Sequence, residues 1–449
     1  MKTAEGARPV ADKPQHSIST SAAFLAYETA LAVGFIALFT PYALLRMIRT
    51  TAYRAGLAER LSLRPETQER NRGANPVWIQ AVSMGEVKSV APLVRRINAG
   101  AERSVLLTST TETGFRVANE MFGTDNAISY FPIDFTPIVK RRLSRIRPRV
   151  IVLFETEIWP NFIRAATSMQ IPVSIVNGRI SEKSFRHYRL IPRIFRNVFS
   201  MIDYAGMQSS RDADRAVALG ARPEIVCTCG NMKFDAAPAP PTPRETEDLR
   251  RQLMLGQNDI LIVAGSTHEG EELSVINAYK AVLPRFQCAR LLVAPRHPER
   301  FDEVESLIRK AGLKVWRRSR RDVRTESNSG SVILLDTIGE LASVYGLASL
   351  TFVGGSLTKV GGHNIIEPAA LGKPLLFGPH MHHFEDVKDA FLSRNAAICV
   401  NDEKELILAV SNLLEKPSEA KALGEAGRRV VEENRGATDR YFEALKRYL

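Results

Sequence analysis

Cysteine is scarce in this chain. Only four of the 449 residues are cysteine, which is too few for a disulfide framework in so long a chain. Cys227 and Cys229 are separated by one residue, which is not the CxxC spacing of zinc and redox sites, and they lie in an apolar, strand-like stretch. We therefore expect all four cysteines to be reduced thiols with a structural role.

The usual motifs for phosphate, metal and nucleic-acid binding are also missing. There is no GxxxxGKS/T sequence, and no GxGxxG sequence follows a strand-like run. His268 does not begin an HExxH zinc motif, because Glu272 stands where the second histidine would be. His380, His382 and His383 could ligate a metal, but on a loop that enters a helix we expect a polar wall or cap, and we predict no metal site. The basic stretches lack interleaved aromatic residues, so we expect no nucleic-acid partner.

Positive charge is abundant in one part of the chain. Lys and Arg number 61 against 49 Asp and Glu, a formal net charge of +12. Residues 46–235 hold 29 of the basic and 17 of the acidic residues, so the whole excess lies there. A one-sided excess predicts an anionic partner, and we expect Arg141, Arg142 and Arg145 to contact a membrane or a phosphorylated substrate. The neighbouring basic residues are Lys140, Arg147, Arg149, Arg186, Arg189, Arg193 and Arg196.

Residues 22–45 form an apolar run in which Glu28 is the one charged residue. At about 1.5 Å per residue, a helix of this length can cross a bilayer. Five arginines follow between residues 46 and 64, so the positive-inside rule keeps the rest of the chain in the cytoplasm. We therefore predict an N-terminal extension at 1–21 and a single membrane-anchor helix at 22–45. A cleaved signal peptide would carry its positive charge on the other side, and an interfacial helix is a weaker alternative.

After this run, short apolar stretches rich in β-branched residues alternate with stretches of helical spacing. This pattern predicts parallel strands and crossover helices, and therefore an α/β fold. A proline-rich segment at 236–243 interrupts the pattern and reads as a linker. We predict two Rossmann-like, doubly wound domains, 46–235 and 244–449, that face a cleft. The expected strands are 77–82, 104–108, 150–154 and 173–176 in the first domain, and 260–264, 291–294, 332–335, 350–353 and 374–377 in the second.

Charged residues follow the predicted strands of the first domain, at the edge where open α/β sheets bind ligands. Glu86 comes after the strand at 77–82 and could act as a general base. Glu155 and Glu157 follow the strand at 150–154, and paired carboxylates at a strand end favour a functional role over packing. Lys233 stands directly before the linker, where a hinge would aim it at the cleft.

In the second domain, glycine pairs follow the predicted strand at 350–353. The pairs at 354–355 and 361–362 are expected to leave backbone N–H groups free at a helix start, which would form an anion site. Arg296 would add a charge-assisted contact to a phosphate. Glu367 could accept hydrogen bonds from ribose hydroxyls. Together these residues predict a site for a phosphorylated ligand.

The same residues resemble the bacterial 3-deoxy-D-manno-octulosonic acid (Kdo) transferase family. The resemblance runs in order over roughly residues 30–445, and several of its sequence blocks are specific to that family. The blocks are Ser-Met-Gly-Glu (83–86), Phe-Glu-Thr-Glu-Ile-Trp-Pro-Asn (154–161), Gly-Asn-Met-Lys-Phe-Asp (230–235), Ser-Thr-His-Glu-Gly-Glu (266–271), Pro-Arg-His-Pro-Glu-Arg-Phe (295–301) and 352–364.

The resemblance implies an inverting GT-B glycosyltransferase that moves Kdo from CMP-Kdo to the phosphorylated lipid A precursor. The domain at 46–235 would then bind the acceptor at an anionic membrane surface, on the cytoplasmic side of the inner membrane, and the domain at 244–449 would bind CMP-Kdo. No cofactor and no metal are implied. Glu86 would be the proton acceptor, and Glu155 and Lys233 would stabilise the transition state. The residues implied to bind CMP are Pro295, Arg296, Ile338, Gly339, Glu340, Asn364, Ile365, Ile366 and Glu367.

Two alternatives remain open at this point. The first is another GT-B enzyme, either a transferase with a different nucleotide sugar or an epimerase, because the glycine-rich block is shared more widely. The second is a membrane-anchored protein without enzymatic activity that binds nucleic acid through its basic domain. The number of Kdo residues transferred does not follow from these motifs.

Overall fold

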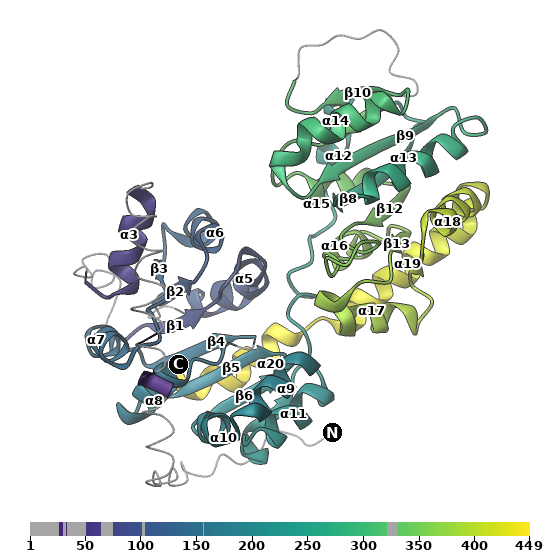
Figure 1. The fold of residues 1–449 in the computed structure, drawn as a ribbon. Coiled ribbons are helices and arrows are strands. Elements are labelled where there is room, and N and C mark those ends of the chain that lie inside the picture. The colour runs from purple at the N-terminus through teal and green to yellow at the C-terminus, as the bar shows by residue number, and fades with distance from the viewer. Residues whose placement is uncertain are drawn as a thin grey trace. The chain divides into compact units, whose positions relative to one another are not determined.

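The computed structural model divides the chain into two units (Figure 1). The first comprises Met1–Ala236 and Arg435–Leu449, and the second comprises Ala237–Asn434. The expected second domain at 244–449 is therefore corrected, because its last fifteen residues belong to the first unit. The residues that the structure describes are 27–29, 33, 51–63, 75–100, 104–155, 157–320 and 331–449.

The first unit contains a parallel sheet whose described strands are ordered β3-β2-β1-β4-β5-β6-β7. The chain runs outward from β1 to β3 and then continues on the other side of β1 with β4. The topological switch point, where open α/β sheets bind ligands, is therefore between β1 and β4. The strands are β1 (Val77–Gln80), β2 (Val105–Ser109), β3 (Ala127–Tyr130), β4 (Val150–Phe154), β5 (Val173–Gly178), β6 (Tyr204–Met207) and β7 (Val226–Thr228).

Helices cover both faces of this sheet, because successive strand residues point to opposite sides and both sides are apolar. Trp78 and Ile151 belong to one core cluster, and Val77 and Val152 belong to the other. The helices are α3 (Thr51–Arg60), α5 (Met84–Asn98), α6 (Glu112–Phe122), α7 (Thr136–Ile146), α8 (Pro160–Ser168), α9 (Glu182–Leu190), α10 (Pro192–Ser200), α11 (Ser210–Ala218) and α20 (Ala437–Leu445).

Helix α20 joins the first unit although it lies at the end of the chain. Its buried residues Tyr441 and Phe442 belong to the core on the α5 side of the sheet. The carboxylate of Asp235 accepts hydrogen bonds from the backbone N–H groups of Gly436 (2.7 Å) and Thr438 (2.5 Å). A carboxylate at this place satisfies N–H groups that have no partner within the helix. Asp235 therefore connects the end of the first domain's βα array to the start of α20.

The second unit has its own parallel sheet, with the described strands ordered β10-β11-β9-β8-β12-β13-β14. By the same reasoning its switch point is between β8 and β12. Its strands are β8 (Ile260–Thr267), β9 (Ala289–Pro295), β10 (Lys314–Arg317), β11 (Ser331–Leu334), β12 (Leu350–Val353), β13 (Leu375–Phe377) and β14 (Ile398–Cys399). Its helices are α12 (Pro243–Gln252), α13 (Glu271–Val282), α14 (Phe301–Lys310), α15 (Leu341–Val344), α16 (Ile366–Ala370), α17 (Glu385–Leu392), α18 (Glu403–Glu415) and α19 (Pro417–Asn434).

The predicted fold class, an α/β protein with two parallel sheets, is confirmed. The predicted linker at 236–243 extends too far at its C-terminal end. Thr242 caps α12, and Pro243 is the first residue of that helix. Thr242 and Glu245 form a reciprocal capping box, a local signal for a helix start. All four cysteines lie in the described part of the chain and are free thiols.

Most of the predicted anchor at 22–45, and all of the extension at 1–21, lie outside the described residues. Among the residues that are described, no helix combines the length and the apolar character that crossing a bilayer requires. Tyr27 is described: it packs against the core of the first unit and hydrogen-bonds to Asp134. Asp134 is buried and also accepts the N–H groups of Asn161 and Phe162 at the start of α8. Tyr27 is therefore attached to the first unit.

The basic run on α7 does not form one continuous charged surface. Arg142 is 1% exposed, and its guanidinium donates to the hydroxyl of Ser129 over 2.6 Å. Arg145 donates to the carbonyl oxygen of Ser62 over 2.9 Å. Arg141 is exposed. The expectation that all three arginines contact a membrane or acceptor is therefore wrong for Arg142, because its side chain is in the protein interior.

Candidate active site

Glu86 lies in the first turn of α5, directly after β1. Its carboxylate turns back toward the start of the helix, where Oε2 accepts the N–H of Val82 (2.8 Å) and Oε1 accepts the hydroxyl of Ser83 (3.1 Å). Burial raises the pKa of Glu86, and the charge of Glu155 adds to this effect, so that the pKa reaches about 8 although the bond from Val82 lowers it. A fixed carboxylate with a pKa near neutrality is suited to accept a proton.

Glu155 follows β4, the neighbour of β1, and forms an ion pair with Lys233. Lys233 Nζ lies 2.9 Å from Glu155 Oε1, and the two side chains are 17% and 19% exposed. Glu155 has a φ of 59°, in the left-handed region that residues other than glycine rarely adopt. Such strain is typical of functional sites, where the surrounding contacts hold the backbone in place. The structure therefore brings together three residues that the sequence placed at separate strand ends.

A network of amide side chains holds Lys233 in place. The N–H of Lys233 donates to the side chain of Asn231 (2.9 Å), and Asn231 donates to Gln208 Oε1 (3.0 Å). Gln208 in turn donates to the carbonyl oxygen of Asn177 (2.9 Å), whose side chain accepts the N–H of Met232 (2.8 Å). Asn177 lies in β5, has a φ of 54° and is fully buried. The loop that carries Lys233 is therefore connected to the end of the sheet.

Glu157 is a third carboxylate at this end of the sheet. Burial raises its pKa to about 7, the hydrogen bond from the indole N–H of Trp159 (3.0 Å) lowers it, and the charge of Glu155 raises it. The sequence selected Glu157 as one member of a pair but assigned it no role. The charges of Glu155 and Glu157 both raise the pKa of Glu86, so the proton affinity of Glu86 depends on both neighbouring carboxylates.

In the second unit, the residues implied to bind CMP are found in three loops at the carboxyl ends of strands. Pro295 is the last residue of β9, and Arg296 follows it with an exposed side chain. The N–H of Arg296 donates to the carbonyl oxygen of Thr267, the last residue of β8, over 3.0 Å. The backbone of Arg296 is thus placed beside the β8 end of the switch point. Its contact with a nucleotide stays a prediction.

The loop after β11 carries Ile338, Gly339 and Glu340. Ile338 is 77% exposed, and Gly339 has a φ of 95°, which favours glycine. Glu340 forms an ion pair with Arg318 (2.8 Å) and accepts a hydrogen bond from Thr337. Exposed aliphatic and backbone groups next to a fixed carboxylate could hold a base and a ribose.

The third loop leads into α16. Asn364 donates to Glu367 Oε1 (3.1 Å), and its own Oδ1 accepts the N–H of Ile366 (3.1 Å). Ile365 and Ile366 are fully buried, so only their backbone groups could contact a ligand. Glu367 is the second residue of α16, so its carboxylate lies at the start of that helix.

The first glycine pair does not form the expected anion site. The N–H groups of Gly355 (2.6 Å), Ser356 (2.8 Å) and Leu357 (2.8 Å) all donate to the carboxylate of Glu271, which is fully buried at the start of α13. The same carboxylate accepts the N–H of His268 (2.9 Å). The prediction of free N–H groups is therefore wrong here, because an anion of the protein itself occupies the nest that they form.

The second glycine pair is also engaged. The N–H groups of Gly361 (3.1 Å) and Gly362 (2.7 Å) donate to the carbonyl oxygen of Gly355. The loop that contains His380, His382 and His383 packs against these glycines, since the N–H of His383 donates to the carbonyl oxygen of Gly361 (3.0 Å). In the described part of the chain, no three His, Cys, Asp or Glu side chains are grouped so that they could hold a metal ion.

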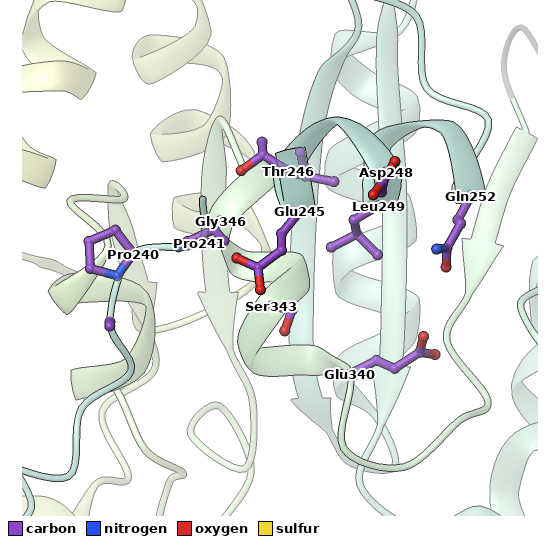
Figure 2. A pocket seen from close by; sticks show the side chains of 12 residues that line it. Pro240, Pro241, Glu245, Thr246, Asp248, Leu249, Gln252, Glu340, Ser343 and Gly346 are labelled. Atoms are coloured by element: carbon purple, nitrogen blue, oxygen red, sulfur yellow. The ribbon is translucent and has the colours of Figure 1, made fainter. Parts of the chain in front are cut away.

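Figure 2 shows a cavity of about 580 Å³ in the second unit, beside α12 and α15. Glu340 lines it, but the other residues implied to bind CMP do not. Glu245 and Asp248 add two further carboxylates to its lining. An acidic cavity repels a phosphate, so we do not assign it to the nucleotide.

Two units that each contain a doubly wound parallel sheet, with polar residues at both switch points, define a two-domain α/β protein of the GT-B type. Solved structures show the same fold. A UDP-GlcNAc 2-epimerase from Neisseria meningitidis has a TM-score of 0.58 at 11% identity, covering 83% of this chain and 100% of that one. A glycosyltransferase from Rickettsia africae has a TM-score of 0.56 at 13% identity, covering 83% and 98%.

Sequence relatives identify the family. Residues 55–236 match the family described as 3-deoxy-D-manno-octulosonic-acid transferase (kdotransferase). A 3-deoxy-D-manno-octulosonic acid transferase of Haemophilus influenzae is 33% identical over 407 residues, which are 90% of this chain and 93% of the relative. That of Bordetella pertussis is 33% identical over 397 residues, 84% and 88% of the two chains. The chain belongs to the Kdo transferase family and is a glycosyltransferase.

Proposed function

We propose that this enzyme transfers Kdo from CMP-Kdo to the phosphorylated lipid A precursor, with inversion at the anomeric carbon. The observation that carries the proposal is the arrangement at the β1/β4 switch point. Glu86, with a pKa raised to about 8, is within electrostatic reach of Glu155, which pairs with Lys233 at 2.9 Å. The family and the names of its members support Kdo as the transferred sugar.

The reaction follows from the charges at this site. Glu86 accepts the proton of the acceptor hydroxyl, whose oxygen forms a bond to the anomeric carbon of Kdo. The bond from that carbon to the phosphate oxygen of CMP breaks, and CMP leaves with the electron pair. Positive charge develops on the sugar ring during this step, as in other glycosyl transfers. Glu155 supplies the opposing negative charge, and the ion pair with Lys233 orients its carboxylate.

We further propose that the enzyme works at the cytoplasmic face of the inner membrane, with residues 22–45 as the attachment. The hydrogen bond between Tyr27 and Asp134 ties the start of this segment to the same unit as the residues that follow it. A span that puts Tyr27 at the far side of the bilayer is incompatible with this bond. The contact therefore favours attachment along the membrane surface over a complete crossing.

A second feature supports an anionic membrane as the partner. At the junction of α9 and α10, Leu190 is 76% exposed and Ile191 is 47% exposed. Aliphatic side chains surrounded by basic ones are suited to the headgroup region of an anionic bilayer. The exposed basic residues on these two helices are Lys183, Arg186, Arg189, Arg193 and Arg196.

The transfer is tested by incubating the purified chain with CMP-Kdo and lipid A precursor. The mass of the product is then measured by mass spectrometry. Glu86→Ala should abolish the product and leave CMP binding intact. Near-normal turnover in that variant would refute the assignment of the base, and stronger binding of UMP or UDP than of CMP would refute the donor.

The membrane surface is tested by flotation with vesicles that contain phosphatidylglycerol. Leu190→Ser should weaken vesicle binding, whereas Leu408→Ser, at another exposed leucine (61%) in the second unit, should not. Equal effects of both substitutions would argue against the α9–α10 surface as the contact.

A further inference from the structure

Two histidines meet at the β8/β12 switch point of the second unit. His268 follows β8, and His363 lies in the loop between β12 and α16. Their Nε2 atoms are 2.8 Å apart, and their rings are nearly parallel, with an angle of 9° and centroids 5.0 Å apart. The ring of His297, after β9, stands edge-on to His268 at 5.1 Å. Neither histidine of the pair was assigned a role by the sequence.

The short distance between the two Nε2 atoms limits the charge that the pair can carry. One nitrogen must carry the hydrogen and the other must accept it, so two imidazolium rings, each with an Nε2–H, cannot share this geometry. Burial lowers the pKa of His363 to about 3 and also lowers the pKa of His268. At neutral pH the pair in the free enzyme is therefore uncharged.

The groups around the pair are mostly basic. His268 faces Glu271, His297, Arg296 and Arg300, and His363 faces Arg296, His383 and His297. Glu271, the one carboxylate among them, is held by four backbone N–H groups. Arg300 pairs with the buried Glu272 at 2.7 Å. Arg296, whose side chain is exposed, is therefore the cation beside the pair that could contact an added anion.

The backbone of the neighbouring loop cannot supply the anion site, because Glu271 already occupies the N–H groups of residues 355–357. The side chains of the His268–His363 pair and of Arg296 could instead donate at this switch point. All three stand at the carboxyl ends of neighbouring strands, where this type of sheet binds nucleotides.

We propose that the His268–His363 pair and Arg296 form the subsite for the phosphate of the nucleotide-sugar donor, and that the pair takes up one proton when the phosphate binds. This inference rests on the proposed function, in which the donor is CMP-Kdo. A bound phosphate stabilises the imidazolium form, which can donate to the phosphate or to its neutral partner. The proton comes from solvent and returns to it when CMP leaves.

The test compares CMP with cytidine, which lacks the phosphate, by isothermal titration of the full chain. At pH 7.5, titrations in buffers of different ionisation enthalpy should show uptake of about one proton with CMP and none with cytidine. Loss of a charge-assisted hydrogen bond is worth roughly a tenfold change in affinity or more. His363→Gln and His268→Gln should each weaken CMP by at least about that factor, remove the proton uptake and leave cytidine unchanged.

His187→Gln is the matched control, because His187 is an exposed histidine on α9 of the first unit. It should change neither nucleotide affinity nor proton uptake. The inference is overturned if the parent protein takes up no proton with CMP, a result that needs no variant to fold. It is also overturned if both glutamine variants keep the parental ratio of CMP to cytidine affinity.

These outcomes are separate from those that test the proposed function. An enzyme that makes the Kdo product but whose histidine variants bind CMP normally would contradict the inference and leave the function intact. A chain that binds uridine nucleotides in preference to CMP would contradict the proposed function itself.

Discussion

Replacing Glu86 by glutamine should affect catalysis and stability in opposite directions. Glutamine keeps the shape of the side chain but cannot accept a proton, and a lost general base typically costs about 10²- to 10⁴-fold in rate. In the proposed mechanism only the ionised form of Glu86 is active. With a pKa of about 8, roughly one tenth of Glu86 is ionised at pH 7, so kcat/KM should rise about tenfold per pH unit below pH 8 and level off above it.

The same pKa predicts a stability effect. Glu86 has a higher pKa in the folded protein (about 8) than its ordinary value of 4.5, so the folded state holds the proton more tightly. Its contribution to stability is complete below pH 4.5 and is lost as the pH rises through 8. At about 1.4 kcal/mol per pH unit, ionising folded Glu86 costs at most about 5 kcal/mol relative to the unfolded chain.

Glutamine avoids this cost but loses part of the hydrogen bonding to Val82 and Ser83. We therefore expect Glu86→Gln to be more stable than the parent by about 1–3 kcal/mol at pH 9, and the difference to disappear near pH 5. Denaturant unfolding at several pH values measures this. Glu112→Gln, an exposed carboxylate in the first turn of α6, is the control and should show no such pH dependence. A flat kcat/KM from pH 6 to 9, or a Glu86→Gln variant less stable than the parent at pH 9, would refute the reasoning.

Three further predictions concern other residues. Lys233→Met should lower kcat by about 10²- to 10³-fold in the mass-spectrometric transfer assay. The reason is that Glu155 loses its ion pair with Lys233, in which Nζ and Oε1 are 2.9 Å apart. Arg142→Gln should destabilise the first unit by about 2–4 kcal/mol in denaturant unfolding because it breaks a buried hydrogen bond, whereas Arg141→Gln should leave stability unchanged and weaken vesicle binding. Glu271→Gln should destabilise the second unit by about 2–4 kcal/mol, since one oxygen cannot accept all four N–H groups, while the exposed Glu269→Gln should have no effect. Equal stability within either pair of variants would contradict these assignments.

Most inner strands were predicted from the sequence, whereas the edge strands and the inner strand β6 were not. The strands at 150–154 and 350–353 were predicted with their observed bounds, since both are continuous apolar runs buried on both faces of their sheets. Strand β10 (Lys314–Arg317) was missed because it lies at an edge and begins with an exposed lysine, and β14 has only two residues. Edge strands need less apolar surface, so their sequences carry a weaker signal.

The place of α20 was not predictable from local sequence. The helix itself has ordinary amphipathic spacing, but its partner Asp235 is 201 residues from Gly436 along the chain. Nothing in either segment indicates the other. The C-terminal boundary of the second unit therefore became visible only in the folded structure.

The chemistry of the candidate site could also be predicted only in part from the sequence. The strand-end rule selected Glu86 and Glu155, and the structure brings them within electrostatic reach of each other, because residues that follow neighbouring parallel strands lie at the same sheet edge. Their catalytic roles stay a prediction. The rule that glycine-rich loops offer free N–H groups failed at Gly355, because it cannot state whether a carboxylate of the protein already occupies them. Glu271 is 84 residues from Gly355, and a first-turn acidic residue is common in helices for other reasons.

The two switch points differ in charge in a way that matches the two halves of the proposed reaction. The first gathers Glu86, Glu155 and Glu157, so it can accept a proton and oppose positive charge on a sugar. The second gathers histidines and Arg296, and its buried Glu271 accepts backbone N–H groups, so the histidines and Arg296 are the groups proposed to receive an anion. Glycosyl transfer from a nucleotide sugar requires both, because a proton is removed from the acceptor while a phosphate leaves the donor. The same sheet topology thus supports opposite electrostatic roles, and the residues after the strands, rather than the strands, decide which role each unit has.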